Sequence, residues 1–82
     1  DEMAAEEGFV RRDIETDDVG MLIRIARHLA DDYPDSAVLL IGEKAAVAAV
    51  GEDSDRDARE MVGEVAGEVQ GDAAFAKGFN LE

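Results

Sequence analysis

The hydrophobic pattern of the chain begins with a short β-type stretch followed by a well-defined helix. Residues 9 to 15, FVRRDIE, carry β-favouring side chains in imperfect alternation, which is typical of an edge strand. Between residues 17 and 33 apolar side chains recur at helical spacing, acidic residues crowd the start, and Pro34 follows at once. The pattern therefore predicts a helix that ends before this proline.

Two uncharged apolar runs occupy the middle of the chain. Residues 37 to 42, AVLLIG, form an unbroken run that is typical of a strand covered on both faces, and residues 45 to 50, AAVAAV, form a second run. Only a short break separates them, so the pair predicts a β-hairpin. We expect the larger side chains of both runs to be buried beneath two helices, namely Val38, Leu40, Val47 and Val50.

A second helix is predicted after the hairpin. Ser54 precedes Asp57 at capping-box spacing, and apolar residues between positions 58 and 69 then follow one helical face up to Gly71. Residues 72 to 82 are compatible with a terminal strand, a turn or a frayed end. The chain therefore reads as a small two-layer α/β domain, β-α-β-β-α with an undecided terminal strand, whose two helices pack on one face of a short sheet.

The ends of the chain differ from the middle in composition. Residues 1 to 8, DEMAAEEG, are acidic, and we interpret them as the end of a helical linker. The globular domain is expected over residues 9 to 79, and residues 80 to 82 as a tail whose closing Leu-Glu resembles a cloning scar. Because the chain does not open with methionine, we expect a domain cut from a longer protein.

The chain is of ordinary globular composition apart from its charge. Its 82 residues make one small domain, and a hydrophobic content of 46% separates it from disordered chains. The lack of cysteine excludes disulfides and thiolate sites and favours a cytoplasmic location. No uncharged run approaches the roughly 20 apolar residues of a membrane-spanning helix, so no membrane partner is expected.

The charge balance is strongly acidic, with 21 Asp and Glu against 8 Lys and Arg and a net charge of -13. Such a field repels nucleic-acid phosphates and destabilises the compact state through self-repulsion. The acidic residues are spread along the whole chain, as in halophilic proteins, which work where salt near 1 M shortens the screening length to about 3 Å. We interpret the acidity as an adaptation to salt rather than as a partner-binding feature.

One acidic stretch matches part of a calcium-binding loop. Asp53, Asp55, Asp57 and Glu64 occupy positions 1, 3, 5 and 12 of that pattern. Ala58 stands where the loop requires glycine for its sharp turn, and the helical pattern continues through the segment. A capped helix start on an acidic surface is the preferred interpretation, so no metal or cofactor is expected.

Catalytic motifs are not apparent in the sequence. His28 is the single histidine, and it shares the outer face of the predicted helix with Arg24 and Arg27, which is typical of a surface residue. No serine or threonine stands in a nucleophile-elbow pattern. We therefore expect no enzymatic activity from this fragment.

Basic side chains are informative because they are scarce. In an acidic protein, a basic patch kept on one side would form a local site for phosphates. The alternative is that each cation pairs with a nearby carboxylate such as Asp13 or Asp31. The candidate phosphate contacts are Arg11 and Arg12 on the first strand, Arg24 and Arg27 on the helix, Lys44 in the hairpin turn, and Lys77 near the last glycine.

The order of these elements carries a resemblance to a known family. The phrases MLIRIARHLADDYPDSAVLLIGEKAAVAAVGE, DAREMVGEVAGEVQG and FAKGF fall in an order that resembles the C-terminal globular domain of alanyl-tRNA synthetases, over residues 9 to 79. That domain is related to the accessory domain of DHH-family phosphoesterases. The family has a glycine-rich run before a phrase like Phe-Ala-Gln-Gly-Gly, whereas this chain keeps Gly71 and Gly78 around Phe75, Ala76 and Lys77.

The resemblance implies a tRNA-contacting and assembly role without aminoacylation, since the catalytic domains of such an enzyme lie upstream. By that likeness Arg24, Arg27, Lys44 and Lys77 are the foremost phosphate contacts, and Phe75 and Phe79 close the core or stack on bases. The parent protein would be an alanine-tRNA ligase that could also join two copies of the chain as a homodimer. Two alternatives stay open: an accessory domain of a phosphoesterase that holds nucleic acid, and a protein-interaction module without a nucleic-acid partner.

Overall fold

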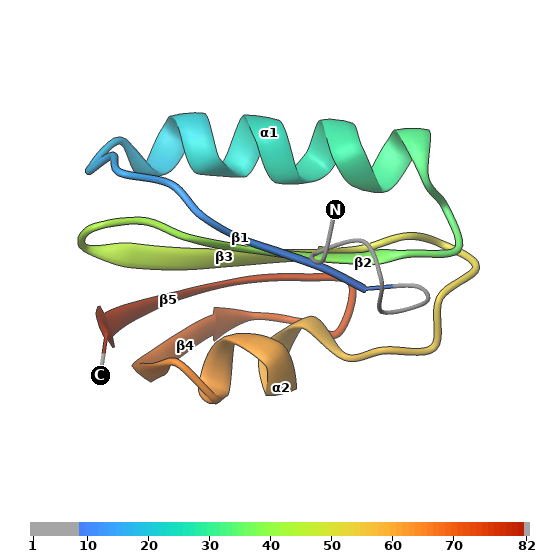
Figure 1. Ribbon diagram of the computed structural model, residues 1–82. Helices are drawn as coiled ribbons and strands as arrows, with labels where there is room; N and C mark the ends of the chain where they lie inside the picture. Colours follow the sequence, from blue (N-terminus) through green and yellow to red (C-terminus); the bar gives the residue numbers. More distant parts are fainter. Residues whose placement is uncertain (1–8, 82) are drawn as a thin grey trace.

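The chain folds into strands and helices whose order matches the predicted one up to residue 58. The computed structural model describes residues 9–81 (Figure 1). The elements found there are β1 (Phe9–Asp13), α1 (Val19–Asp32), β2 (Ala37–Ile41), β3 (Ala45–Val50), α2 (Ala58–Gly63), β4 (Ala66–Gly71) and β5 (Phe75–Leu81). The expected class, a small α/β domain with two helices on a short sheet, is confirmed for this part of the chain.

The described strands form one mixed sheet in the order β1-β2-β3-β5-β4. Strand β1 pairs in parallel with β2 through the α1 crossover, whereas the pairs β2–β3, β3–β5 and β4–β5 are antiparallel. The predicted edge position of the first strand and the predicted hairpin of the two apolar runs are thus confirmed. Strand β5 inserts between β3 and β4, so the last segment of the chain becomes an inner strand.

The two helices lie on opposite faces of the sheet, so the prediction that both pack on one face is wrong (Figure 1). Helix α1 covers a core that includes Val38, Leu40 and Val47, and helix α2 covers one that includes Leu39 and Ala48. The physical reason lies in β2 and β3, which are apolar at every position and therefore present two faces that must both be shielded from water.

The predicted burial of the hairpin is largely confirmed. Val38, Leu40 and Val47 are almost fully buried beneath α1. Val50 differs because it faces the other side of the sheet, where it is half-buried at the border of the α2 core.

The second helix is much shorter than predicted. Helix α2 ends at Gly63, and the rest of the predicted helix, including Val69, forms strand β4. Glycines at positions 63, 67 and 71 each weaken a helix by about 1 kcal/mol relative to alanine. Pairing with β5 gives the same residues a ladder of strand hydrogen bonds along one side of β4, and this long-range partner decides the outcome.

The cap of this helix is Asp57 rather than Ser54. The Asp57 Oδ1 atom accepts hydrogen bonds from the backbone N–H groups of Arg59 at 2.9 Å and Glu60 at 3.4 Å. The Ser54 hydroxyl instead accepts from the Arg56 backbone N–H at 3.3 Å within the preceding loop. Asp57 therefore satisfies the first orphan donors of α2, and the predicted capping box is not formed.

The C-terminal segment is a strand, which decides among the three readings left open by its sequence. Asp72 stabilises the turn before it by accepting hydrogen bonds from the backbone N–H groups of Ala74 and Phe75 at 3.0 and 3.1 Å. Strand β5 continues to Leu81, which packs on the α2 core. The fold therefore extends past the expected boundary at residue 79, while the predicted linker at residues 1 to 8 lies outside the described residues.

Candidate nucleic-acid interface

Part of the sheet surface on the α1 side has no helix above it. Within residues 9–81, helix α1 packs chiefly across β3 and β2, and on β5 it reaches Phe75 at the border of its core. The side chains on this uncovered half form what we call the open face. Its members are Phe75, Lys77 and Phe79 of β5, with Glu68 and Gln70 beside them on β4.

The alternation of β5 explains how this face forms. Phe75, Lys77 and Phe79 pair with Ala49, Val47 and Ala45 of β3, and the row that contains Val47 points toward the α1 side. The small residues between them, Ala76 and Gly78, are buried toward α2. Because strands rise about 3.3 Å per residue, the two phenylalanines lie about 13 Å apart with Lys77 midway between them. All three residues are half-buried, so packing holds the inner part of each side chain while the outer part is accessible to solvent.

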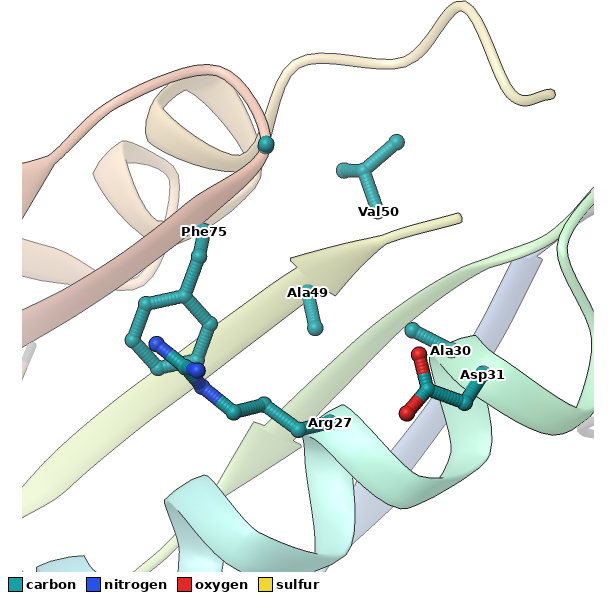
Figure 2. A pocket seen from close by; sticks show the side chains of 7 residues that line it. Arg27, Ala30, Asp31, Ala49, Val50 and Phe75 are labelled. Atoms are coloured by element: carbon teal, nitrogen blue, oxygen red, sulfur yellow. The ribbon is translucent and has the colours of Figure 1, made fainter. Parts of the chain in front are cut away.

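Helix α1 adds a cation to one end of the open face. The Arg27 guanidinium lies over the Phe75 ring, 4.5 Å from its centroid (Figure 2). A guanidinium in this position is attracted by the negative face of the ring, which fixes an otherwise flexible exposed side chain. Arg27, one of the two helix arginines predicted to contact phosphate, is therefore held against strand β5. Lys77 lies two residues along that strand from Phe75.

Lys44 lies in the β2–β3 turn near the other end of β5. It is exposed and precedes Ala45, which is the register partner of Phe79. Arg27 and Lys77 are thus placed at β5, and the backbone of Lys44 lies beyond Phe79. These are three of the six predicted contacts.

The other three predicted contacts lie elsewhere. Arg24 is exposed on α1, and at 100° per residue it projects away from the buried stripe of Leu22 and Ala26. Arg11 and Arg12 lie on the edge strand β1, which β2 and β3 separate from β5. Strand order and helix rotation thus distribute the six residues over different surfaces, and the contact of each with phosphate stays a prediction.

The open face also carries acceptor groups. Glu68 Oε2 accepts a hydrogen bond from the Gln70 amide at 3.4 Å, and its Oε1 accepts one from the Asn80 amide at 3.5 Å. The surface therefore combines cations, aromatic rings, an amide and one carboxylate rather than a single sign of charge. Such a mixture favours ligands that offer stacking surfaces and hydrogen-bond donors in addition to negative charge.

A small pocket opens where the end of α1 meets the ends of β3 and the β4–β5 turn. It has a volume of about 260 Å³ and adjoins the Phe75 end of the open face (Figure 2). Its lining residues are Arg27, Ala30, Asp31, Ala49, Val50, Ala74 and Phe75.

Sequence reasoning assigned the aromatic residues of β5 chiefly to core closure. Phe75 does pack at the border of the α1 core, but it and Phe79 are also accessible on the open face. The signal was present in FAKGF, where aromatic and basic residues alternate at the strand period. It could not be used while the segment was left undecided between strand and turn.

The glycines that the resemblance emphasised have other roles here. A Cβ atom on Gly78 would lie 2.2 Å from Cγ1 of Val62 and 2.7 Å from Cβ of Ala66, so this residue allows α2 and β4 to pack on β5. Gly71 has a φ of 126°, which suits the start of the β4–β5 turn. Gly78 thus serves core packing on the α2 side, away from the open face.

Two further features were sought among residues 9–81, a metal site and a membrane-spanning helix. No group of three or more His, Asp and Glu side chains in that range is arranged to hold a metal ion. His28 Nε2 lies 3.4 Å from Asp32 Oδ2, and both side chains are exposed on α1. In the same range, neither helix has the length and apolar composition needed to cross a membrane.

Comparison with known proteins adds no identification. The chain matches no protein-family model, and no curated protein is significantly similar to it. The open face and the pocket beside it therefore carry the functional argument.

Proposed function

We propose that this chain is an accessory tRNA-binding and assembly domain that performs no catalysis of its own. The observation that carries the proposal is the open face, where Arg27 and Lys77 lie at a strand that also exposes Phe75 and Phe79, with Lys44 in the turn beyond Phe79. Cations and stacking rings on one accessible sheet surface are the combination used to bind unpaired nucleotides.

The acidic net charge of the chain restricts how the open face could bind RNA. A chain with a net charge of -13 repels a polyanion at long range, so any affinity must arise from a local cluster of cations and from stacking. The fixed position of Arg27 over Phe75 lowers the entropy cost of contacting a phosphate there. Carboxylates on the surrounding surfaces would disfavour other orientations of the RNA.

The resemblance to the C-terminal domain of alanyl-tRNA synthetases selects tRNA among nucleic acids. Under this proposal the parent protein is a cytoplasmic alanine-tRNA ligase of a halophilic organism, and this domain contacts tRNA for catalytic domains elsewhere in that protein. Homodimerisation belongs to the parent protein in the same way. If a phosphoesterase is the parent instead, the open face would hold single-stranded nucleic acid for it.

Binding to whole tRNA tests the proposal. The wild-type chain, Lys77→Gln and the matched control Arg11→Gln should be compared by fluorescence anisotropy over a series of salt concentrations. We expect Lys77→Gln to weaken binding several-fold and to lower the salt slope by about one unit, because one phosphate contact is lost. Arg11→Gln removes the same charge from β1 and should change affinity only slightly.

Circular dichroism and urea denaturation at the same salt control for folding of both variants. Equal losses for Lys77→Gln and Arg11→Gln would remove the open face from the proposal. If the wild-type chain does not bind tRNA at any salt concentration, the function is that of a protein-interaction module instead.

A further inference from the structure

The pocket at the Phe75 end of the open face is a hollow open to solvent, lined by both apolar and polar groups. Its volume of about 260 Å³ far exceeds the roughly 30 Å³ share of one water molecule. Small apolar side chains form much of its wall, including Ala30, Ala49 and Ala74, and the ring of Phe75 closes one side (Figure 2). A flat ring can lie with one face against these small side chains while its other face stays open to solvent.

The polar groups of the pocket are one cation and one carboxylate on successive turns of α1. Arg27 and Asp31 are four residues apart, so they share a face of the helix, and both line the pocket. The guanidinium offers only hydrogen-bond donors, and the carboxylate offers only acceptors. A ligand that satisfies both must present acceptors and donors at the rim of a flat ring, which is the pattern of a nucleobase edge.

Among the bases, guanine fits this pair of groups best. It presents O6 and N7 as adjacent acceptors to an arginine, and N1–H with the N2 amino group as adjacent donors to a carboxylate. Adenine and cytosine each offer a single amino group on that edge and uracil a single imide N–H, so none of them can bind the carboxylate through two adjacent donors. Lys77 lies two residues along β5 from Phe75, where it can contact the phosphates of a strand that enters the pocket.

We infer that the pocket between Arg27, Asp31 and Phe75 binds an unpaired guanine of an RNA strand laid along the open face. This inference rests on the proposed function, and it assigns that function a base preference. Asp31 determines the preference, Phe75 contacts the ring, and Lys77 contacts the backbone. The acidic side chain therefore contributes specificity at a small cost in affinity for the polyanion.

Four RNA oligonucleotides that differ only in one central base within a uridine background test the inference. With the wild-type chain, the guanine-containing strand should bind about fivefold more tightly than the adenine-containing strand, the lower end of what a bidentate base contact contributes. Asp31→Asn should reduce that ratio to about one, because the amide has one acceptor where the carboxylate has two. Asp35→Asn removes the same charge from an exposed position in the turn after α1 and should leave the ratio unchanged.

The ratio of affinities separates this inference from the proposed function. Asp35→Asn should bind all four strands somewhat more tightly, and Asp31→Asn the three strands without guanine, since each variant removes one negative charge, so only the ratio reports base recognition. Equal binding of the four strands by the wild-type chain, or an unchanged ratio in Asp31→Asn, would overturn the inference while leaving RNA binding intact. Binding of guanosine monophosphate as tight as that of the strand would also overturn it, because the site would then be one for a free nucleotide. No binding of any strand would overturn the proposed function together with the inference.

Discussion

Arg24 and Arg27 carry the same charge on the same helix, yet their surroundings differ. Arg27 lies over the Phe75 ring at the open face, whereas Arg24, about 60° around α1 from Arg27, points farther away from the sheet. From the sequence, both were expected on one exposed helix face and were given the same role as phosphate contacts. The difference appears only once β5 is known to lie beside β3, because Phe75 is distant from α1 along the chain.

These two arginines provide a matched pair of variants. Arg27→Gln should weaken tRNA binding several-fold and lower the salt slope by about one unit, since it removes a fixed cation from the binding surface. Arg24→Gln should have a much smaller effect. Anisotropy titrations of both variants at matched salt measure the difference, and equal losses would show that α1 acts through long-range charge alone.

Asp57 is the N-cap residue of the short helix α2. Its carboxylate caps the backbone N–H groups of Arg59 and Glu60, so Asp57→Ala should lower the free energy of unfolding by about 1 kcal/mol. Urea denaturation in constant salt measures this change. Asp55→Ala removes an equal charge from the exposed loop before the helix and serves as the control. A loss of equal size in both variants would attribute the effect to charge rather than to capping.

At the scale of elements, the first part of the fold could be predicted because its signals are local. A continuous helical stripe, a proline and two uncharged runs specify α1, β2 and β3 without reference to distant residues. The segment from residue 58 onward could not be predicted in this way. Its apolar residues fit a helical period, but β4 forms because β5 returns to pair with it, and periodicity does not report that pairing.

Gly78 is where the elements of the α2 side come closest together. The added methyl group of Gly78→Ala would overlap Val62 and Ala66, so the variant should lose about 1–3 kcal/mol of stability through overpacking. The control is Gly67→Ala on β4, where a Cβ atom meets its nearest neighbour, the Asn80 carbonyl oxygen, at 3.4 Å. That substitution should change stability by less than about 0.5 kcal/mol. Equal denaturation midpoints for Gly78→Ala and the wild type would contradict the packing described for α2.

At the scale of the whole molecule, charge opposes folding at low salt. With a net charge of -13 and most carboxylates exposed, repulsion should decrease as salt screens them. We expect the thermal midpoint to rise by several degrees between low and molar potassium chloride, which corresponds to about 1 kcal/mol for a domain of this size. Calorimetry over that range measures the shift. An unchanged or lower midpoint would contradict the halophilic interpretation.

The candidate site is also a property of the whole molecule. Its six candidate cations were chosen from the sequence because positive charges are scarce in the chain, but only strand order could reveal that Arg27 and Lys77 both lie at β5. The same order removes Arg11 and Arg12 from it. The pocket could not be predicted at all, since Asp31 and Phe75 meet only across the α1–β5 boundary.

The most direct test of the open face is a nuclear magnetic resonance titration of the isotope-labelled chain with tRNA at low salt. If this face binds RNA, the largest chemical-shift changes should fall on residues 75 to 79, on Gln70, and around Arg27 and Lys44, with little change on β1 or α2. Changes concentrated on Arg11 and the rest of β1, or spread evenly over the molecule, would contradict the account.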